Sequence, residues 1–224
     1  MKLMRFKKTA ALLAAVGVVA VAGPATAAPP WVVSVGTSTT PVAFSAYTKA
    51  PIQFTVLRAG NLVPMSCDAA SAAGIIKPGS YANGLNVAEI QGTSWSKCVA
   101  PGGIDLNVYH PEDSKWALNL TGLSGPTWAG YINNINARVK SKVAGLCAFT
   151  VTGRANGSFN TAQVSGNNNF TQTLNVNQVN TVANPGTLIV SNVSGCVGLV
   201  ANGDTAGFVG SFKVYNPVAL VGIS

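Results

Sequence analysis

The sequence predicts an all-β protein: a sandwich or barrel of about ten short antiparallel strands with two disulfides. Three observations lead to this prediction. Short runs alternate between apolar and polar residues with a period of two, which is typical of half-buried strands. No long window rich in Ala, Leu, Glu and Lys repeats with the helical period. Gly, Pro or Asn ends most of the runs, as expected where strands are joined by turns.

The first 27 residues predict a secretory signal peptide. Basic residues in Met1–Lys8 are followed by an apolar run, Ala10–Val21, and small residues at Ala25 and Ala27 suit signal peptidase. The apolar run is too short to span a bilayer comfortably. We therefore expect an exported mature chain, 28–224, that is secreted or held in the cell envelope.

Residues 28–224 are expected to form a single all-β domain. Ser96–Val99 resembles Ser194–Val197, however, and this internal similarity leaves open two related halves with a boundary near 125–145.

The period-two runs predict the strands in chain order. They are Val42–Tyr47, Ile52–Leu57, Leu85–Ile90, Ile104–Tyr109, Trp116–Leu120, Trp128–Arg138, Cys147–Thr152, Phe170–Asn177, Thr187–Val193 and Phe208–Tyr215. Alternation places Gln172, Leu174 and Val176 on one face of their strand. The facing of Trp128–Arg138 is ambiguous, because both of its faces carry apolar and polar residues.

The connections are predicted by turn residues. Ala100–Gly103, Asn156-Gly157, Asn184–Gly186 and Asn202–Asp204 supply the fixed φ of Pro or the positive φ of Gly and Asn. Ala69–Ala73 is compatible with one helical turn.

Four cysteines in an exported chain predict two disulfides, with three possible connectivities. We favour Cys67–Cys98 and Cys147–Cys196, because nearer partners close smaller loops. The alternative is a metal site of four thiolates, which is disfavoured because no Cys-x-x-Cys pair exists.

Charged residues are few, and the net charge of the chain after the signal peptide is only weakly positive. Charged residues make up 9% of the chain, against roughly 25% in typical soluble domains. The first 27 residues hold four of the 14 basic residues and none of the six acidic ones, so we expect no nucleic-acid partner. Arg138, Lys140 and Lys142 alternate along one strand, as a solvated face or a polyanion patch. Low charge suits an exported protein, and equally a β-barrel whose outer face meets lipid.

The sequence offers few candidate catalytic residues. His110 is the only histidine, and with Glu112 and Asp113 it forms either a base with carboxylates, a weak cation site or simply a polar turn. Glycosidase chemistry needs two carboxylates, and nothing in their spacing singles out a pair. The six are Asp68, Glu89, Asp105, Glu112, Asp113 and Asp204. With no Gly-x-Ser-x-Gly, His-Glu-x-x-His or phosphate-loop motif, we expect no enzyme, no catalytic residue, no metal and no cofactor.

Aromatic residues are the candidates for ligand binding. Trp95, Trp116, Trp128 and Tyr131 could form a platform for sugar rings or another apolar ligand. The alternative is that they pack in the core, with Trp95 near Cys98 lying against a disulfide.

Several motifs are similar to those of a group of small secreted actinobacterial proteins to which no biochemical activity is assigned. They are Pro41–Phe44, Cys67–Gly74, Trp95–Cys98, Trp116–Asn119 and, the most specific, Leu188–Asp204. This resemblance implies an exported, disulfide-bonded β protein of an actinobacterium and transfers no catalytic residue. The chain departs from the group at Leu146-Cys147, where Gly-Cys is usual.

The sequence thus predicts a non-catalytic exported domain that acts at the cell surface or outside the cell, by binding or as envelope structure. One alternative is a β-barrel or oligomeric channel in an outer, mycolate-type envelope layer. Another is a carrier of an apolar small molecule. The partners compatible with these hypotheses are envelope glycan, lipid or further copies of the chain.

Overall fold

The computed structural model describes residues 30–48, 50–124, 126–162, 170–216 and 218–224. The predicted signal peptide, residues 1–27, lies outside these residues. Within them the chain forms fourteen β-strands and one short 3₁₀ turn, with no α-helix, and every strand pair is antiparallel. The predicted all-β class is confirmed.

The strands differ widely in length. In chain order they are β1 (Trp31–Val35), β2 (Val42–Thr48), β3 (Ile52–Arg58), β4 (Asn61–Ile76), β5 (Gly79–Tyr81), β6 (Ala88–Ala100), β7 (Ile104–Tyr109), β8 (Trp116–Ser124), β9 (Thr127–Ser141), β10 (Cys147–Asn160), β11 (Phe170–Gln178), β12 (Leu188–Gly195), β13 (Thr205–Asn216) and β14 (Val221–Ile223). The 3₁₀ turn η1 is Cys196–Gly198. Strands β4, β6, β9, β10 and β13 have 12 to 16 residues; β4 was not predicted, and the other four extend beyond the predicted bounds.

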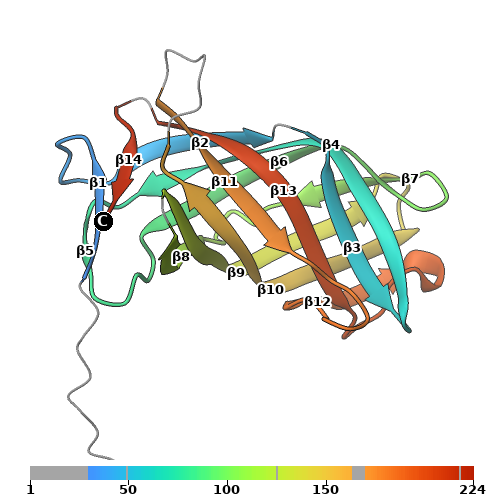
Figure 1. The fold of residues 1–224 in the computed structure, drawn as a ribbon. Helices are drawn as coiled ribbons and strands as arrows, with labels where there is room; N and C mark the ends of the chain where they lie inside the picture. The colour runs from blue at the N-terminus through green and yellow to red at the C-terminus, as the bar shows by residue number, and fades with distance from the viewer. Residues whose placement is uncertain (1–29, 49, 125, 163–169, 217) are drawn as a thin grey trace, which may run out of the picture.

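The large sheet closes on itself as a barrel (Figure 1). At one end the described strands pair in the ring β2-β4-β6-β8-β9-β10-β11-β13 and back to β2. At the other end β3, β7 and β12 take the places of β2, β8 and β11. The five long strands therefore run the length of the barrel, and pairs of short strands share the three remaining positions.

The two ends of the barrel are closed differently. A small sheet, ordered β14-β1-β5, lies across the end that β2, β8 and β11 form, which we call the capped end (Figure 1). The opposite end, which β3, β7 and β12 form, holds both disulfides and η1, and we call it the disulfide end.

The inside of the barrel is apolar and much of the outside is polar. Along β10, Phe149, Val151 and Ala155 are buried, whereas Arg154 and Asn156 are exposed. On β11, Gln172, Leu174 and Val176 are all buried, as the alternation predicted.

A bulge resolves the ambiguous facing of Trp128–Arg138. Ile132 and Ile135 are both buried, although residues three apart on a regular strand face opposite sides. Asn134 between them has φ 57°, and the pairing of β9 with β10 shifts register there. Asn tolerates this left-handed conformation better than most residues. The bulge turns both isoleucines into the barrel.

Two local predictions are wrong for the same physical reason. Ala69–Ala73 belongs to β4 and is not a helical turn, and Asn156-Gly157 lies inside β10 and is not a turn. A Cβ on Gly157 would clash with the carbonyl oxygen of Asn175, and one on Gly74 would clash with that of Glu89. The small residues in these strands let neighbouring backbones approach closely.

Strands from both sides of the 125–145 region contribute to one barrel wall. Strand β13 pairs with β2 and β3, and β9 pairs with β7 as well as with β8 and β10.

Candidate functional site

Two disulfides link neighbouring segments at the disulfide end. Cys67 on β4 and Cys98 on β6 are directly opposite each other and bonded, and Cys147 on β10 is bonded to Cys196 at the start of η1. The predicted connectivity is confirmed. These disulfides are consistent with an oxidising, extracellular environment.

Two apolar cavities lie in the part of the barrel that the structure describes, one toward each end. The first has a volume of about 70 Å³ and lies beneath the cap. Val33, Val221 and Ile223 line it from the cap, while Trp128 and Leu174 line it from the barrel wall. The small sheet is therefore part of the first cavity.

The second cavity lies toward the disulfide end and has a volume of about 80 Å³. It is lined by aliphatic and aromatic side chains that include Ile52, Met65 and Phe208, and by the Cys67–Cys98 disulfide. An engineered apolar cavity of about 150 Å³ in another protein stays dry and binds benzene. Each cavity here is about half that size, so each suits a narrow apolar group.

The predicted aromatic residues do not form one platform. Trp95 and Trp116 line the second cavity, whereas Trp128 and Tyr131 contribute to the first. Trp95 Nε1 donates to Thr93 Oγ1 at 2.9 Å, and Trp116 Nε1 donates to Ser114 Oγ at 3.1 Å. The N–H groups of both indoles at the second cavity are thus hydrogen-bonded within the protein, and the apolar surface of the rings is left to line the cavity.

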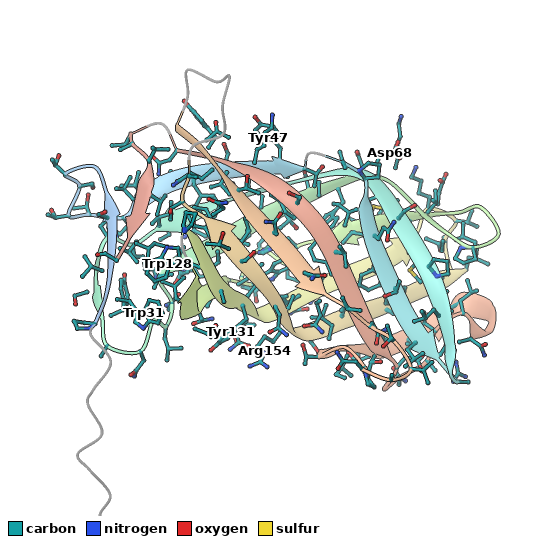
Figure 2. The ribbon with its side chains drawn as sticks, in the orientation of Figure 1. Trp31, Tyr47, Asp68, Trp128, Tyr131 and Arg154 are labelled. Carbon is teal, nitrogen blue, oxygen red and sulfur yellow. A yellow bond between two sulfur atoms is a disulfide. The ribbon has the colours of Figure 1, made fainter. Side chains whose placement is uncertain are left out.

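At the capped end, Trp128 packs edge-on against Trp31, with ring centroids 5.2 Å apart (Figure 2). Tyr131 has a different setting, because alternation along β9 directs it away from the face that carries Ile132. The guanidinium carbon of Arg154 lies 4.9 Å from the centroid of the Tyr131 ring, and Figure 2 shows the two side chains together. Tyr131 is therefore the weakest of the four ligand candidates.

His110 lies in the connection between β7 and β8, where a polar turn was one prediction. Its Nε2 is 2.8 Å from the carbonyl oxygen of Ser114, and its ring lies 4.8 Å from that of Trp116. Its Nδ1 is buried without a hydrogen-bond partner. Glu112 and Asp113 beside it are exposed. The imidazole is thus engaged with its own loop and with Trp116.

The other four carboxylates are each paired with a basic side chain. The pairs are Asp68 with Lys97, Glu89 with Lys77, Asp105 with Lys142 and Asp204 with Arg58. The hydrogen bond from Lys77 holds the pKa of Glu89 below its ordinary value, although partial burial opposes this shift. Arg138 and Lys140 are exposed on β9, so the predicted basic face exists there, while Lys142 is engaged by Asp105.

A buried glutamine that the sequence did not single out attaches the cap to the barrel. Gln172 Oε1 accepts a hydrogen bond from the Val221 backbone N–H, and Gln172 Nε2 donates to the Val221 carbonyl oxygen, both at 2.8 Å. The side-chain amide thereby takes the place of a neighbouring strand for β14. The available sequence signal was a polar residue on the same face as Leu174 and Val176.

Within the described residues, no group of three or more His, Cys, Asp and Glu side chains lies together as a metal site would require. None of the described helical segments has the length and apolarity that a transmembrane helix needs. Comparison with family models, with curated proteins and with solved structures gives no match.

Proposed function

We propose that this protein is an exported, non-catalytic binding protein that carries a small apolar molecule inside its barrel. The observation that carries this proposal is the pair of apolar cavities, which are lined mostly by aliphatic and aromatic side chains. Binding sites for small molecules are concave and mostly apolar, with few polar groups. The predicted signal peptide and the two disulfides support export.

The chemistry of the lining favours an apolar ligand over a sugar. A buried sugar needs hydrogen-bond partners for its hydroxyl groups, since unmet polar groups are costly. The side-chain N–H groups of Trp95 and Trp116 already donate to Thr93 and Ser114. Their remaining surface can contribute apolar contact to a ligand.

The placement of apolar side chains inside the barrel and polar ones outside favours a carrier over a channel. Membrane-spanning barrels present apolar side chains outward to lipid and polar ones inward. Here Phe149 and Val151 are buried inside the wall, and Arg154 and Asn156 are exposed on its outer face. This arrangement suits an apolar cargo surrounded by water.

The first test is to recover the natural cargo. The protein is purified without detergent from the culture medium of its producing organism and weighed intact by native mass spectrometry. We expect a mass above that of the mature polypeptide, which an apolar solvent reduces to the polypeptide mass. Recovery only in detergent extracts of the envelope, as an oligomer, would favour the channel and overturn the proposal.

The second test localises binding with xenon as the probe. Xenon should shift the NMR signals of the Leu174 and Val176 methyl groups in the first cavity, and those of Val151 and Leu188 in the second. Val176→Phe should fill the first cavity and abolish the shift of Leu174. Val209→Phe is the matched control, because Val209 is 41% exposed on β13. Equal responses of both variants would contradict a binding site inside the barrel.

A further inference from the structure

We infer that the two cavities are two segments of one site for a single unbranched alkyl chain, and that Ile132 controls passage of the chain between them. This inference rests on the proposed function and adds the chemical class of the cargo. Ile132 is 6% exposed, and among the described residues it is the one that lines both cavities.

The cavities follow one another along the barrel. On β9, Trp128 and Gly130 line the first cavity, whereas Ile135 and Ala137 line the second, and the change occurs at Ile132.

The neighbouring strand β8 changes cavity at the same level. Leu118 and Leu120 line the first cavity and Trp116 lines the second, and Leu118 is the residue paired with Ile132. Two adjacent strands therefore place the cavities end to end, with the Ile132 side chain at the division.

The β9 bulge is what places this division inside the barrel. With φ 57° at Asn134, both Ile132 and Ile135 are buried, so successive lining residues continue from one cavity into the next. Bulges commonly redirect side chains at functional sites.

Size and shape select a chain over a ring. At about 70 and 80 Å³, each cavity is about half of one that holds benzene. An alkyl chain is one methylene wide and can occupy both segments in turn. A single chain also loses translational and rotational freedom once, whereas two separate ligands lose it twice.

The experiment uses straight-chain alcohols from n-propanol to n-decanol as probes. Methyl NMR reports on the first cavity through Leu174 and Val176, and on the second through Val151 and Leu188. We expect short alcohols to shift either set and longer ones to shift both sets with one shared affinity. Affinity should rise about fourfold for each added methylene until both segments are full.

Variants of the dividing residue sharpen the test. Ile132→Ala should raise the affinity of the alcohols that bridge both cavities at least about fourfold relative to the short alcohols that bind in the second, the equivalent of about one methylene. Ile135→Ala is the control, because Ile135 lines the second cavity only. It should change the affinities of short and long alcohols alike. Ile132→Val serves as a milder variant if the alanine variant fails to fold, with a smaller change in the same direction.

The outcomes separate this inference from the proposed function. If long alcohols shift one methyl set only, or both sets with independent affinities, the cavities are separate sites and the inference fails while the carrier stands. The same holds if the Ile132 variants leave the ratio of affinities unchanged. If neither xenon nor any alcohol enters the barrel, and no cargo accompanies the natural protein, both proposals fail.

Discussion

The two ends of this barrel are held closed by different kinds of interaction. At the disulfide end, Cys67–Cys98 joins β4 to β6 covalently, and Cys147–Cys196 joins β10 to η1. At the capped end, three short strands lie over the first cavity, and β14 is attached to the barrel through hydrogen bonds with Gln172. Covalent links hold in every conformation, whereas hydrogen bonds break and re-form. We therefore expect cargo to enter beneath the cap.

Removal of a disulfide should have the largest effect on stability. The Cys147→Ala/Cys196→Ala variant releases a loop with a sequence separation of 49 residues. Restriction of the unfolded chain by a loop of that size is worth about 4 kcal/mol. Urea unfolding of this variant and of the wild type checks the prediction.

The Cys67→Ala/Cys98→Ala variant sharpens the comparison of the ends, because these cysteines also line the second cavity. It should weaken xenon binding at Val151 more than at Leu174. A loss of stability below about 1 kcal/mol for both double variants would show that the disulfides do little to hold the disulfide end together.

A glycine in the wall near the capped end should give the next largest effect. The added Cβ of Gly74→Ala would meet the backbone of Glu89 on the neighbouring strand, so the strands must move apart. Overpacking of this kind costs about 2–3 kcal/mol. Gly92→Ala is the matched control, because nothing lies within 4 Å of its added Cβ. Similar unfolding free energies for the two variants would contradict the close approach of β4 and β6.

Strands β7 and β4 show why part of the fold could be predicted from the sequence and part could not. Strand β7 was predicted at its observed bounds, because turn residues flank an alternating run. Strand β4 was missed, because its Ala, Ser and Gly residues carry no apolar alternation. Small residues there serve contacts with β2 and β6, neither of which is next to β4 in chain order.

The candidate site was predictable only as a list of aromatic residues. Trp95, Trp116 and Trp128 do line cavities, but their division between two cavities depends on how β8 and β9 cross the barrel. Ile132 could not be singled out, because the bulge at Asn134 buries Ile132 and Ile135 together and so hides which face of the strand points inward. Closure of a barrel is a property of pairings between distant strands, and local periodicity does not report it.

A variant that loosens the cap should lose less stability than the disulfide variants or Gly74→Ala. It should nevertheless increase the motion of the cap more than they do. Gln172→Leu keeps similar volume but removes both hydrogen bonds to Val221 and the one that Gln172 Nε2 donates to the Thr161 carbonyl oxygen at 2.7 Å. The N–H of Val221 and the two carbonyl groups are then left without these partners. The expected loss of stability is about 2 kcal/mol. Hydrogen exchange at Val221 should speed up strongly, while exchange at Cys98 in the disulfide end stays slow. Equal acceleration of hydrogen exchange at both ends would contradict a cap that opens independently of the disulfide end.

Faster cargo exchange should accompany the loosened cap. In Gln172→Leu, the association and dissociation rates of n-hexanol measured at Leu174 should both rise, because the first cavity opens more often. Asn175→Leu is a control on the opposite face of β11, which points away from the cavity. Unchanged exchange rates in Gln172→Leu would place the route of entry elsewhere in the wall.

The smallest effect should come from the ion pair at the capped end. Glu89 is hydrogen-bonded to Lys77, and this lowers the pKa of its carboxyl group in the folded protein. A lowered folded pKa stabilises the protein above the unfolded value of about 4.3, and the stabilisation disappears as pH falls through the folded value. Glu89→Gln should therefore be less stable than the wild type at pH 7, by less than about 1 kcal/mol.

The difference between Glu89→Gln and the wild type should shrink as the pH is lowered from 7 to 3, which urea unfolding at each pH measures. Asp68→Asn is the matched control: Asp68 pairs with Lys97 in an open setting where the Asp68 side chain is 63% exposed. Its stability should differ little from the wild type at any pH in this range, because water and salt screen such a pair. A difference at Glu89 that stayed constant with pH would mean that lost packing, and not the carboxylate charge, accounts for the effect.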